Sequence, residues 1–150
     1  MASGNNGDSL KIGWKYHEQL CKKLSTKIDF DPDYILCINS GGLLVGKLLS
    51  EYKKKPLLVI SAKSYTKRER GPLEIEEFSA LEKVKGKVLL VDDLADSGKT
   101  LLGVSEKLKT FKAITQLKTA TLIVKPISLF KPDYFVVEDS RWIIFPYEGG

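Results

Sequence analysis

Cysteine is scarce in this sequence of 150 residues, which contains only Cys21 and Cys37. The two lie in separate apolar stretches rather than in a CxxC pair, so they offer no spacing typical of metal ligands. A chain of this length buries roughly 70% of the surface that its unfolded form exposes, and it can fold without a disulfide or a structural zinc ion. We therefore expect two free thiols and exclude zinc and redox chemistry.

Long apolar runs are also missing. The longest, such as Val88 to Val91, fall far short of the ~20 residues that a transmembrane helix needs. Residues Met1 to Ser9 are polar and carry no apolar stretch of the kind found in a signal peptide. The sequence therefore predicts a disordered tail over residues 1–9, one domain over residues 10–150, a cytoplasmic location and no membrane partner.

Arginine is scarce as well, because Arg68, Arg70 and Arg141 are the only three and lysine supplies the rest of the positive charge. The 24 Lys and Arg residues exceed the 19 Asp and Glu residues to give a net charge of +5, and they are scattered along the chain. Proteins that bind nucleic acids usually concentrate their charge and favour arginine, whose guanidinium group contacts phosphates with two hydrogen bonds. We therefore expect a solvated lysine-rich surface and no nucleic-acid partner.

Apolar segments of two kinds alternate along the chain. Short apolar runs typical of buried strands are separated by segments with apolar residues at three- and four-residue steps, the pattern of amphipathic helices. The predicted strands are Tyr34–Ile38, Leu57–Ser61, Val88–Val91 and Thr119–Val124, and the predicted helices are Leu10–Ile28, Leu43–Tyr52 and Leu101–Phe111. This order predicts an α/β fold with a mostly parallel central sheet flanked by helices, in which ligands bind at the carboxyl ends of the strands.

One long segment, Lys63 to Ser79, interrupts this alternation. It is rich in charged residues, includes Gly71 and Pro72, and shows little helical periodicity. A loop of this length is usually either a functional lid or disordered, and the composition favours disorder.

The most informative segment follows the third predicted strand. It contains an acidic pair and then a five-residue motif that opens a helix: Asp92-Asp93, Leu94-Ala95, Asp96-Ser97-Gly98-Lys99-Thr100. Gly98 permits a tight turn, and the free amides of a helix N-terminus, with nearby hydroxyl groups, form a binding site for a phosphate monoester. A P-loop requires a glycine where this sequence has Asp93, which argues against an ATPase. A surface turn in which Asp96 merely caps the helix is the alternative that this segment alone leaves open.

The acidic pair predicts a second role for the same loop. Two adjacent carboxylates can accept hydrogen bonds from the vicinal hydroxyls of a ribose. They can also help to hold a divalent cation, because hard cations prefer oxygen ligands. The residues thus predict that one loop binds both a sugar and a phosphate.

This segment resembles the signature of the type I phosphoribosyltransferases: an apolar strand, two acidic residues, a short spacer and Asp-Thr/Ser-Gly-x-Thr. From about Trp14 to Glu148 the chain is most similar to the short xanthine-guanine and hypoxanthine-guanine (6-oxopurine) phosphoribosyltransferases of bacteria and archaea. Four further segments in the same order carry the resemblance: Ile38–Leu43, Lys63-Ser64-Tyr65, Val124-Lys125-Pro126 and Trp142–Glu148. The resemblance implies a type I phosphoribosyltransferase fold with a small C-terminal hood over the purine and a flexible lid loop.

The resemblance also implies a reaction in purine salvage. A ring nitrogen of guanine, xanthine or hypoxanthine would displace pyrophosphate from 5-phosphoribosyl 1-pyrophosphate, with Mg²⁺ on the pyrophosphate, to give a nucleoside monophosphate. Asp96 would be the base that accepts the imidazole proton of the purine. Asp92 and Asp93 would act with it as catalytic residues that bind the ribose hydroxyls, and they are candidate contacts of the metal.

Three binding subsites follow from the same resemblance. The residues implied for the 5-phosphate are Asp96, Ser97, Gly98, Lys99 and Thr100. Those implied for pyrophosphate are Ser40, Gly41, Gly42, Ser64 and Tyr65, the last two on the lid. Those implied for the purine are Lys125 as a donor to the 6-oxo oxygen, Trp142 as a stacking ring, the backbone of Ile143, and Glu148 as an acceptor from a 2-amino group.

One position departs from the family. Close relatives usually have arginine before the two glycines, where this sequence has Ser40, and a hydroxyl cannot make the bidentate phosphate contact of a guanidinium group. The amides of Gly41 and Gly42, or the side chains of Lys47 or Lys63, are the candidates to replace it.

Two alternatives therefore stay open at this point. One is a non-catalytic protein that senses phosphoribosyl pyrophosphate or a nucleotide, and the other is a phosphoribosyltransferase for a different base. The only histidine, His17, is expected to be a surface or packing residue. The resemblance implies a homodimer or homotetramer, because relatives commonly assemble in this way.

Overall fold

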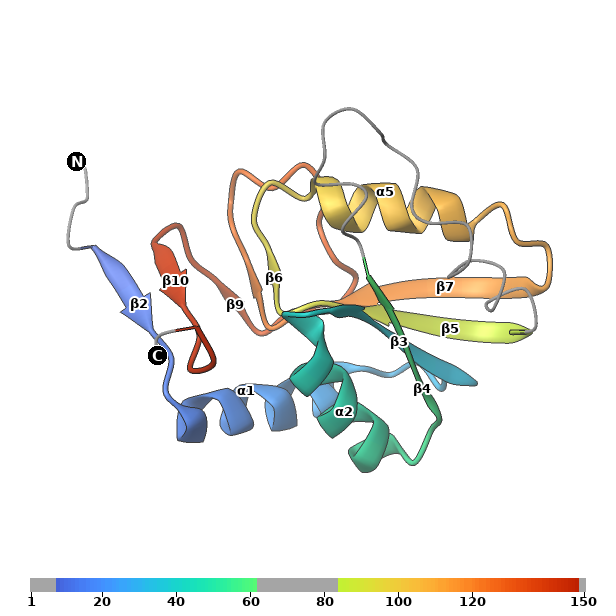
Figure 1. Ribbon diagram of the computed structural model, residues 1–150, viewed down its shortest axis with the longest axis horizontal. Helices are drawn as coiled ribbons and strands as arrows, with labels where there is room; N and C mark the ends of the chain where they lie inside the picture. The colour runs from blue at the N-terminus through green and yellow to red at the C-terminus, as the bar shows by residue number, and fades with distance from the viewer. Residues whose placement is uncertain (1–7, 62–83, 149–150) are drawn as a thin grey trace.

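The computed structural model describes residues 8–61 and 84–148 (Figure 1). The predicted lid Lys63–Ser79, with Ser64 and Tyr65, lies outside these residues, as do residues 1–7 of the predicted tail. The helices are α1 (Trp14–Lys27), α2 (Gly42–Lys53) and α5 (Lys99–Leu108). The strands are β2 (Ser9–Lys11), β3 (Tyr34–Asn39), β4 (Leu57–Ser61), β5 (Gly86–Val91), β6 (Leu94–Ala95), β7 (Ile114–Ala120), β8 (Ile123–Val124), β9 (Val137–Glu138) and β10 (Trp142–Ile144).

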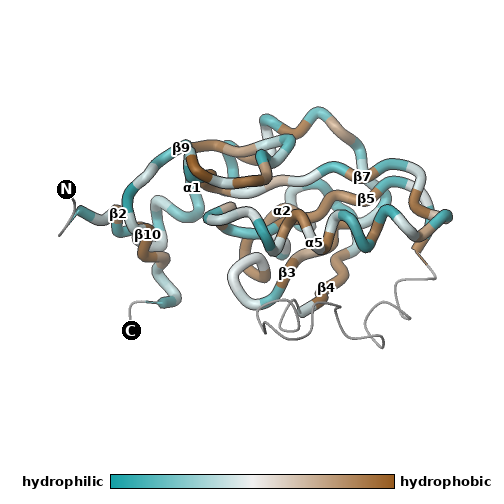
Figure 2. The backbone as a smooth tube through the Cα atoms, turned by 90° about the horizontal axis from the view of Figure 1, so that it is seen from above, coloured by the Kyte–Doolittle hydropathy of each residue, from teal (hydrophilic) through white to brown (hydrophobic). Residues whose placement is uncertain are grey.

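Four parallel strands form the central sheet in the order β4-β3-β5-β7. The middle strands β3 and β5 are almost fully buried from Ile35 to Ile38 and from Val88 to Val91. Continuous apolar runs of this kind are typical of parallel strands that are covered on both faces. In Figure 2 the hydrophobic stretches of these strands gather in the middle of the fold, while many of the turns at its ends are hydrophilic.

Helices cover both faces of this sheet (Figure 1). On one face, α1 and α2 pack against the sheet through buried side chains that include Leu24 and Leu49. On the other face, α5 packs through Leu101, Val104 and Leu108. The predicted α/β fold with a parallel sheet between helices is therefore confirmed.

The N-terminal part of the first predicted helix is a strand instead. The apolar pattern predicts a helix from Leu10, but residues Ser9–Lys11 form β2 and the helix begins at Trp14. β2 pairs in parallel with β10, and the Ile12 N–H donates to the Ile144 carbonyl at 2.8 Å. Ser9, which the sequence places in the tail, pairs with Trp142. The partner strand is remote in sequence, so the local apolar pattern could not reveal the pairing.

The predicted strand Thr119–Val124 is also divided. β7 ends at Ala120, and the chain then leaves the central sheet to form β8 (Ile123–Val124), which lies between β6 and β9 in a second, smaller sheet. The Leu122 N–H donates to the Asp93 carbonyl at 3.1 Å, which ties this crossing to the end of β5.

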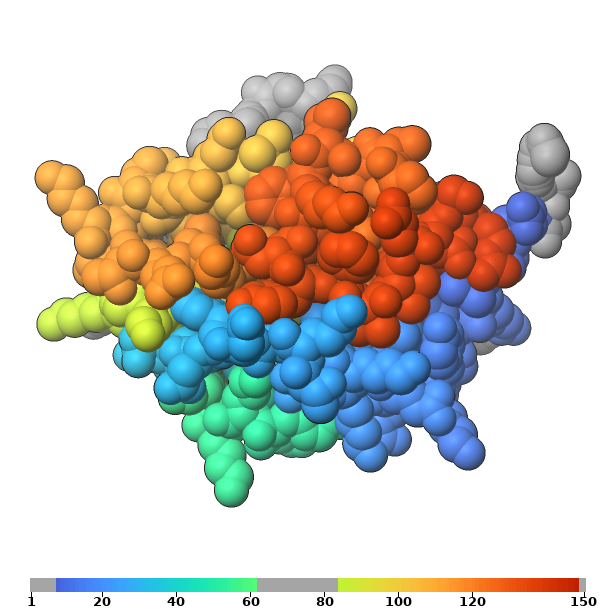
Figure 3. Space-filling view, turned by 180° about the vertical axis from the view of Figure 1, so that it is seen from behind, coloured from blue at the N-terminus to red at the C-terminus, as the bar shows by residue number. Residues whose placement is uncertain are grey.

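The C-terminal segment closes one side of the molecule. The residues after β8, orange to red in Figure 3, cover much of the face beside α1. Their last strand, β10, forms a separate two-stranded sheet with β2. The family resemblance implies that this segment covers the purine, which stays a prediction. None of the helices in the described ranges is long and apolar enough to span a membrane.

Candidate active site

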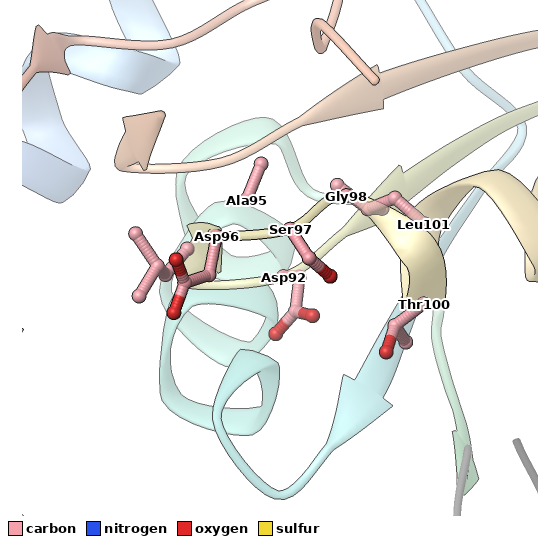
Figure 4. A pocket seen from close by; sticks show the side chains of 8 residues that line it. Asp92, Ala95, Asp96, Ser97, Gly98, Thr100 and Leu101 are labelled. Carbon is pink, nitrogen blue, oxygen red and sulfur yellow. The ribbon is translucent and has the colours of Figure 1, made fainter. Parts of the chain in front are cut away.

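A small pocket opens at the carboxyl end of β5, where the chain passes through β6 into α5. It has a volume of about 90 Å³, and the residues that line it are Asp92, Leu94, Ala95, Asp96, Ser97, Gly98, Thr100 and Leu101 (Figure 4). The oxygen atoms of Asp92, Ser97 and Thr100 lie on the same side of the loop. The structure therefore brings together the predicted phosphate motif and one member of the acidic pair.

Gly98 is required by the geometry of this loop. Its φ of 87° is in the left-handed region, and a Cβ at this position would lie 2.6 Å from the backbone nitrogen of Phe130. The Leu129 N–H donates to the Ser97 carbonyl at 2.8 Å, so the following turn packs directly on the motif. Only glycine combines this conformation with such a close approach of backbone.

The loop presents the N-terminus of α5 to the pocket. Gly98 is the N-cap of α5, and the first turn contains no acidic residue that would neutralise the helix dipole. The Lys99 N–H donates to the Ser97 hydroxyl at 3.2 Å, which holds the serine against the turn. Free amides at a helix N-terminus bind anions, so this end of the pocket suits a phosphate group.

The two carboxylates of the acidic pair face different surroundings. Asp92 lines the pocket, whereas Asp93 accepts a hydrogen bond from the Tyr147 hydroxyl and lies against Gly41. The Asp93 N–H donates to the Asp92 carboxylate at 2.8 Å. The predicted ribose-binding pair is therefore divided, with only Asp92 on the pocket wall.

Asp93 is buried, and Asp92 is partly buried at the wall of the pocket. Burial raises the pKa of Asp92 well above its ordinary value, and the charge of Asp93 raises it further. Burial also raises the pKa of Asp93, while its hydrogen bond from Tyr147 acts in the opposite direction. Such carboxylates gain from any ligand that brings hydroxyl donors or positive charge.

Lys125 lies between the phosphate loop and the C-terminal segment. Its N–H donates to the Ala95 carbonyl at 2.9 Å, and its Nζ lies 3.6 Å from the Asp96 carboxylate. The same Nζ is 5.8 Å from the centre of the Trp142 ring. Trp142 is 65% exposed, which leaves its ring open for stacking, whereas Ile143 beside it is buried in the core.

Two residues that the sequence did not single out support this corner of the site. The Arg141 guanidinium donates to the Asp139 carboxylate at 2.7 and 3.0 Å and lowers its pKa. The Asp139 N–H donates to the Val124 carbonyl at 3.1 Å, which fixes the turn before Trp142 beside Lys125. No sequence motif signals the Asp139 and Arg141 pair.

Glu148, the predicted acceptor from a 2-amino group, accepts a hydrogen bond from the Phe145 N–H at 3.2 Å, so one of its oxygens caps the last turn.

The predicted pyrophosphate loop follows β3. Its Asn39–Ser40 peptide bond is cis, and a Cβ on Gly42 would lie 2.7 Å from the Val91 carbonyl oxygen at the end of β5. The loop therefore packs directly against the acidic pair. Lys47, one of the candidates to replace the missing arginine, lines a different pocket between α1 and α2, and Lys63 lies outside the described residues. Of the described candidates to replace the missing arginine, the amides of Gly41 and Gly42 remain.

A parallel sheet with a helix N-terminus and two adjacent carboxylates at its carboxyl edge is the arrangement found in α/β proteins that bind a phosphorylated ligand. Within this class, the phosphoribosyl transferase domain family matches residues 14–148. The chain belongs to this family.

Known proteins agree with this assignment. The chain is 32% identical to a xanthine-guanine phosphoribosyltransferase from Cereibacter sphaeroides over 148 residues, which covers 91% of this chain and 85% of the relative. It is 28% identical to the enzyme of the same name from Chromohalobacter salexigens, with 87% of this chain and 76% of the relative covered. The crystal structure of a purine phosphoribosyltransferase from Pyrococcus horikoshii superimposes with a TM-score of 0.79 at 31% identity and covers 95% of both chains.

Proposed function

We propose that this protein transfers a phosphoribosyl group from 5-phosphoribosyl 1-pyrophosphate to a 6-oxopurine base in purine salvage. The observation that carries this proposal is the pair formed by the Lys125 ammonium and the Asp96 carboxylate, 3.6 Å apart at the edge of the phosphate pocket. The named relatives, which are xanthine-guanine and purine phosphoribosyltransferases, support the same substrate class.

The lysine and aspartate pair is complementary to one edge of a 6-oxopurine. On that edge the 6-oxo oxygen accepts a hydrogen bond, and the neighbouring N7–H of the free base donates one. Lys125 would donate to the oxygen and Asp96 would accept from N7–H, while Trp142 stacks on the ring. Adenine carries an amino donor at this position instead, and it would oppose the ammonium group of Lys125.

The chemistry assigned to these residues is a displacement at the anomeric carbon. A bond forms between N9 of the purine and this carbon, the bond from the carbon to the pyrophosphate oxygen breaks, and the N7 proton passes to Asp96. The Asp92 carboxylate stabilises positive charge that develops on the ribose. Residues Asp96 to Thr100 hold the 5-phosphate through backbone amides and the hydroxyls of Ser97 and Thr100, and so fix the anomeric carbon relative to the base.

Magnesium fits this site as a partner of the substrate. No three metal-ligating side chains of His, Cys, Asp or Glu gather in the part of the chain that the structure describes. Mg²⁺ is commonly bound by one or two carboxylates together with substrate phosphates. Asp92, which lines the pocket, would supply such a carboxylate, and the ion would neutralise the leaving pyrophosphate.

A base panel tests this function. The protein is incubated with Mg²⁺, phosphoribosyl pyrophosphate and one of guanine, xanthine, hypoxanthine, adenine, uracil or orotate, and the absorbance change is followed. We expect turnover of at least one 6-oxopurine and none of adenine. Thermal stabilisation by phosphoribosyl pyrophosphate without any turnover would instead support a sensor, and turnover of uracil or orotate would support a different acceptor. In keeping with the family resemblance we also propose a homodimer or homotetramer, which sedimentation analysis tests.

A further inference from the structure

Tyr147 joins three parts of the active site that are remote in sequence. It belongs to the C-terminal segment that carries Trp142, and its hydroxyl donates to the Asp93 carboxylate at the end of β5. The same hydroxyl oxygen lies 3.3 Å from the carbonyl oxygen of Gly41, in the loop after β3. The purine-covering segment, the acidic pair and the pyrophosphate loop therefore meet at one side chain.

The ring of Tyr147 is held from two sides. Phe145 stacks on it with a centroid distance of 5.5 Å and an interplanar angle of 4°. His17 of α1 meets it edge-on at 6.0 Å and 87°. A ring fixed in this way keeps its hydroxyl in one place, so its hydrogen bond is set by packing before any ligand binds.

Asp93 depends on this hydroxyl because it has little access to water. The residue is only 9% exposed, and its carboxylate lies so close to Gly41 that a Cβ there would be 2.5 Å from its Oδ2. A buried carboxylate that loses its donor bears a desolvation cost and moves toward other donors. Movement of Asp93 would therefore displace the loop that carries Gly41 and Gly42.

We propose that Tyr147 is a positioning residue whose hydroxyl fixes Asp93 and, through Asp93, the pyrophosphate loop relative to the purine-covering segment. The proposal rests on the proposed function for the identity of the ligand. Its direct consequence concerns pyrophosphate, because the loop that Asp93 supports is the one that would hold this group through its amides.

The variant Tyr147→Phe tests the proposal, because it keeps the ring and removes only the hydroxyl. We expect the dissociation constant of magnesium pyrophosphate, measured by titration calorimetry, to rise about tenfold, in proportion to the loss of one charged hydrogen bond. We expect KM for phosphoribosyl pyrophosphate to rise by a similar factor and KM for the purine to change by less than about twofold. A purely structural role would not divide the two KM values in this way.

Tyr134→Phe is the matched control. Tyr134 also donates its hydroxyl to an aspartate, Asp29, at 2.7 Å, but neither residue lines the pocket. The control should leave both KM values and the pyrophosphate affinity unchanged. Unchanged pyrophosphate affinity in Tyr147→Phe, or an equal loss in the control, would overturn the proposal.

A double-mutant cycle with Asp93→Asn supplies a second measurement. If the hydroxyl acts through Asp93, adding Tyr147→Phe to the Asp93→Asn variant changes pyrophosphate affinity by less than about twofold. If Tyr147→Phe lowers pyrophosphate affinity as much in the Asp93→Asn variant as in the unmodified protein, the hydroxyl does not act through Asp93 and the proposal is overturned. If Tyr147→Phe does not fold, Asp93→Asn alone is expected to weaken pyrophosphate binding, and full affinity would refute the proposal. Absence of turnover in the unmodified protein would reject the proposed function, while the pyrophosphate titrations would still decide the role of Tyr147.

Discussion

Replacement of Lys125 by methionine tests the proposed purine pocket most directly. The lysine side chain is only 11% exposed, and its Nζ lies 3.6 Å from the Asp96 carboxylate and 5.8 Å from the centre of the Trp142 ring. Methionine keeps a flexible apolar side chain of similar length against the ring and removes the ammonium group. The variant therefore separates the hydrogen bond to the 6-oxo oxygen from the packing of this corner.

The structure predicts a small effect of this change on stability and a larger effect on activity. The Asp96 side chain is 55% exposed, so the ion pair is screened by water and contributes about 0.2–1 kcal/mol to stability. A hydrogen bond from a charged group to a substrate oxygen contributes about 1.5–3 kcal/mol, which corresponds to a roughly 10- to 150-fold loss of kcat/KM. We expect Lys125→Met to lower activity by this factor and Tm by only a few degrees.

The assay compares kcat/KM for guanine, hypoxanthine and adenine in the two proteins. Lys131→Met is the matched control, because Lys131 also pairs with a carboxylate, Glu138 at 3.8 Å, and lies 5.2 Å from the ring centre of Phe135. The control should retain full activity. A Lys125→Met variant whose kcat/KM for 6-oxopurines stays within about twofold of the unmodified protein would refute the assignment of Lys125.

Three further changes test other parts of the structure. Asp96→Ala should lower kcat by about 10²- to 10⁴-fold in steady-state assays with little effect on binding of phosphoribosyl pyrophosphate, as loss of a general base does; unchanged kcat would remove Asp96 from this role. Gly98→Ala should destabilise the fold by about 1–2 kcal/mol because of the left-handed conformation alone. Displacement of Phe130, whose backbone nitrogen a Cβ would approach to 2.6 Å, should add to this loss of stability. A Tm equal to that of the unmodified protein would contradict the observed turn. Burial raises the pKa of Cys21 to about 12 and that of Cys37 to about 11, so both thiols stay protonated at pH 8. Both should therefore resist alkylation by iodoacetamide at this pH until urea unfolds the chain. Rapid alkylation of the folded protein would show that these sites are open.

Local signals were sufficient to predict much of this fold. The apolar runs of β3, β4 and β5 and the amphipathic pattern of α2 coincide with the observed elements to within a few residues. The predictions at Leu10 and at Thr119–Val124 were wrong where the chain pairs with a distant strand. Strand pairing depends on partners remote in sequence, so an apolar pattern alone does not say which sheet a short segment joins.

By itself the sequence determined that an acidic pair, a turn at Gly98 and a helix N-terminus follow one another, because these features are adjacent in the chain and stay adjacent in any fold that places them after a strand. Tertiary structure alone decided how the acidic pair is divided. Asp92 lines the pocket, whereas Asp93 turns toward Tyr147 and Gly41. It also decided that Lys125 lies beside both Asp96 and Trp142. Each of these contacts depends on strand register and on the packing of the C-terminal segment, which bring together residues that no local pattern connects.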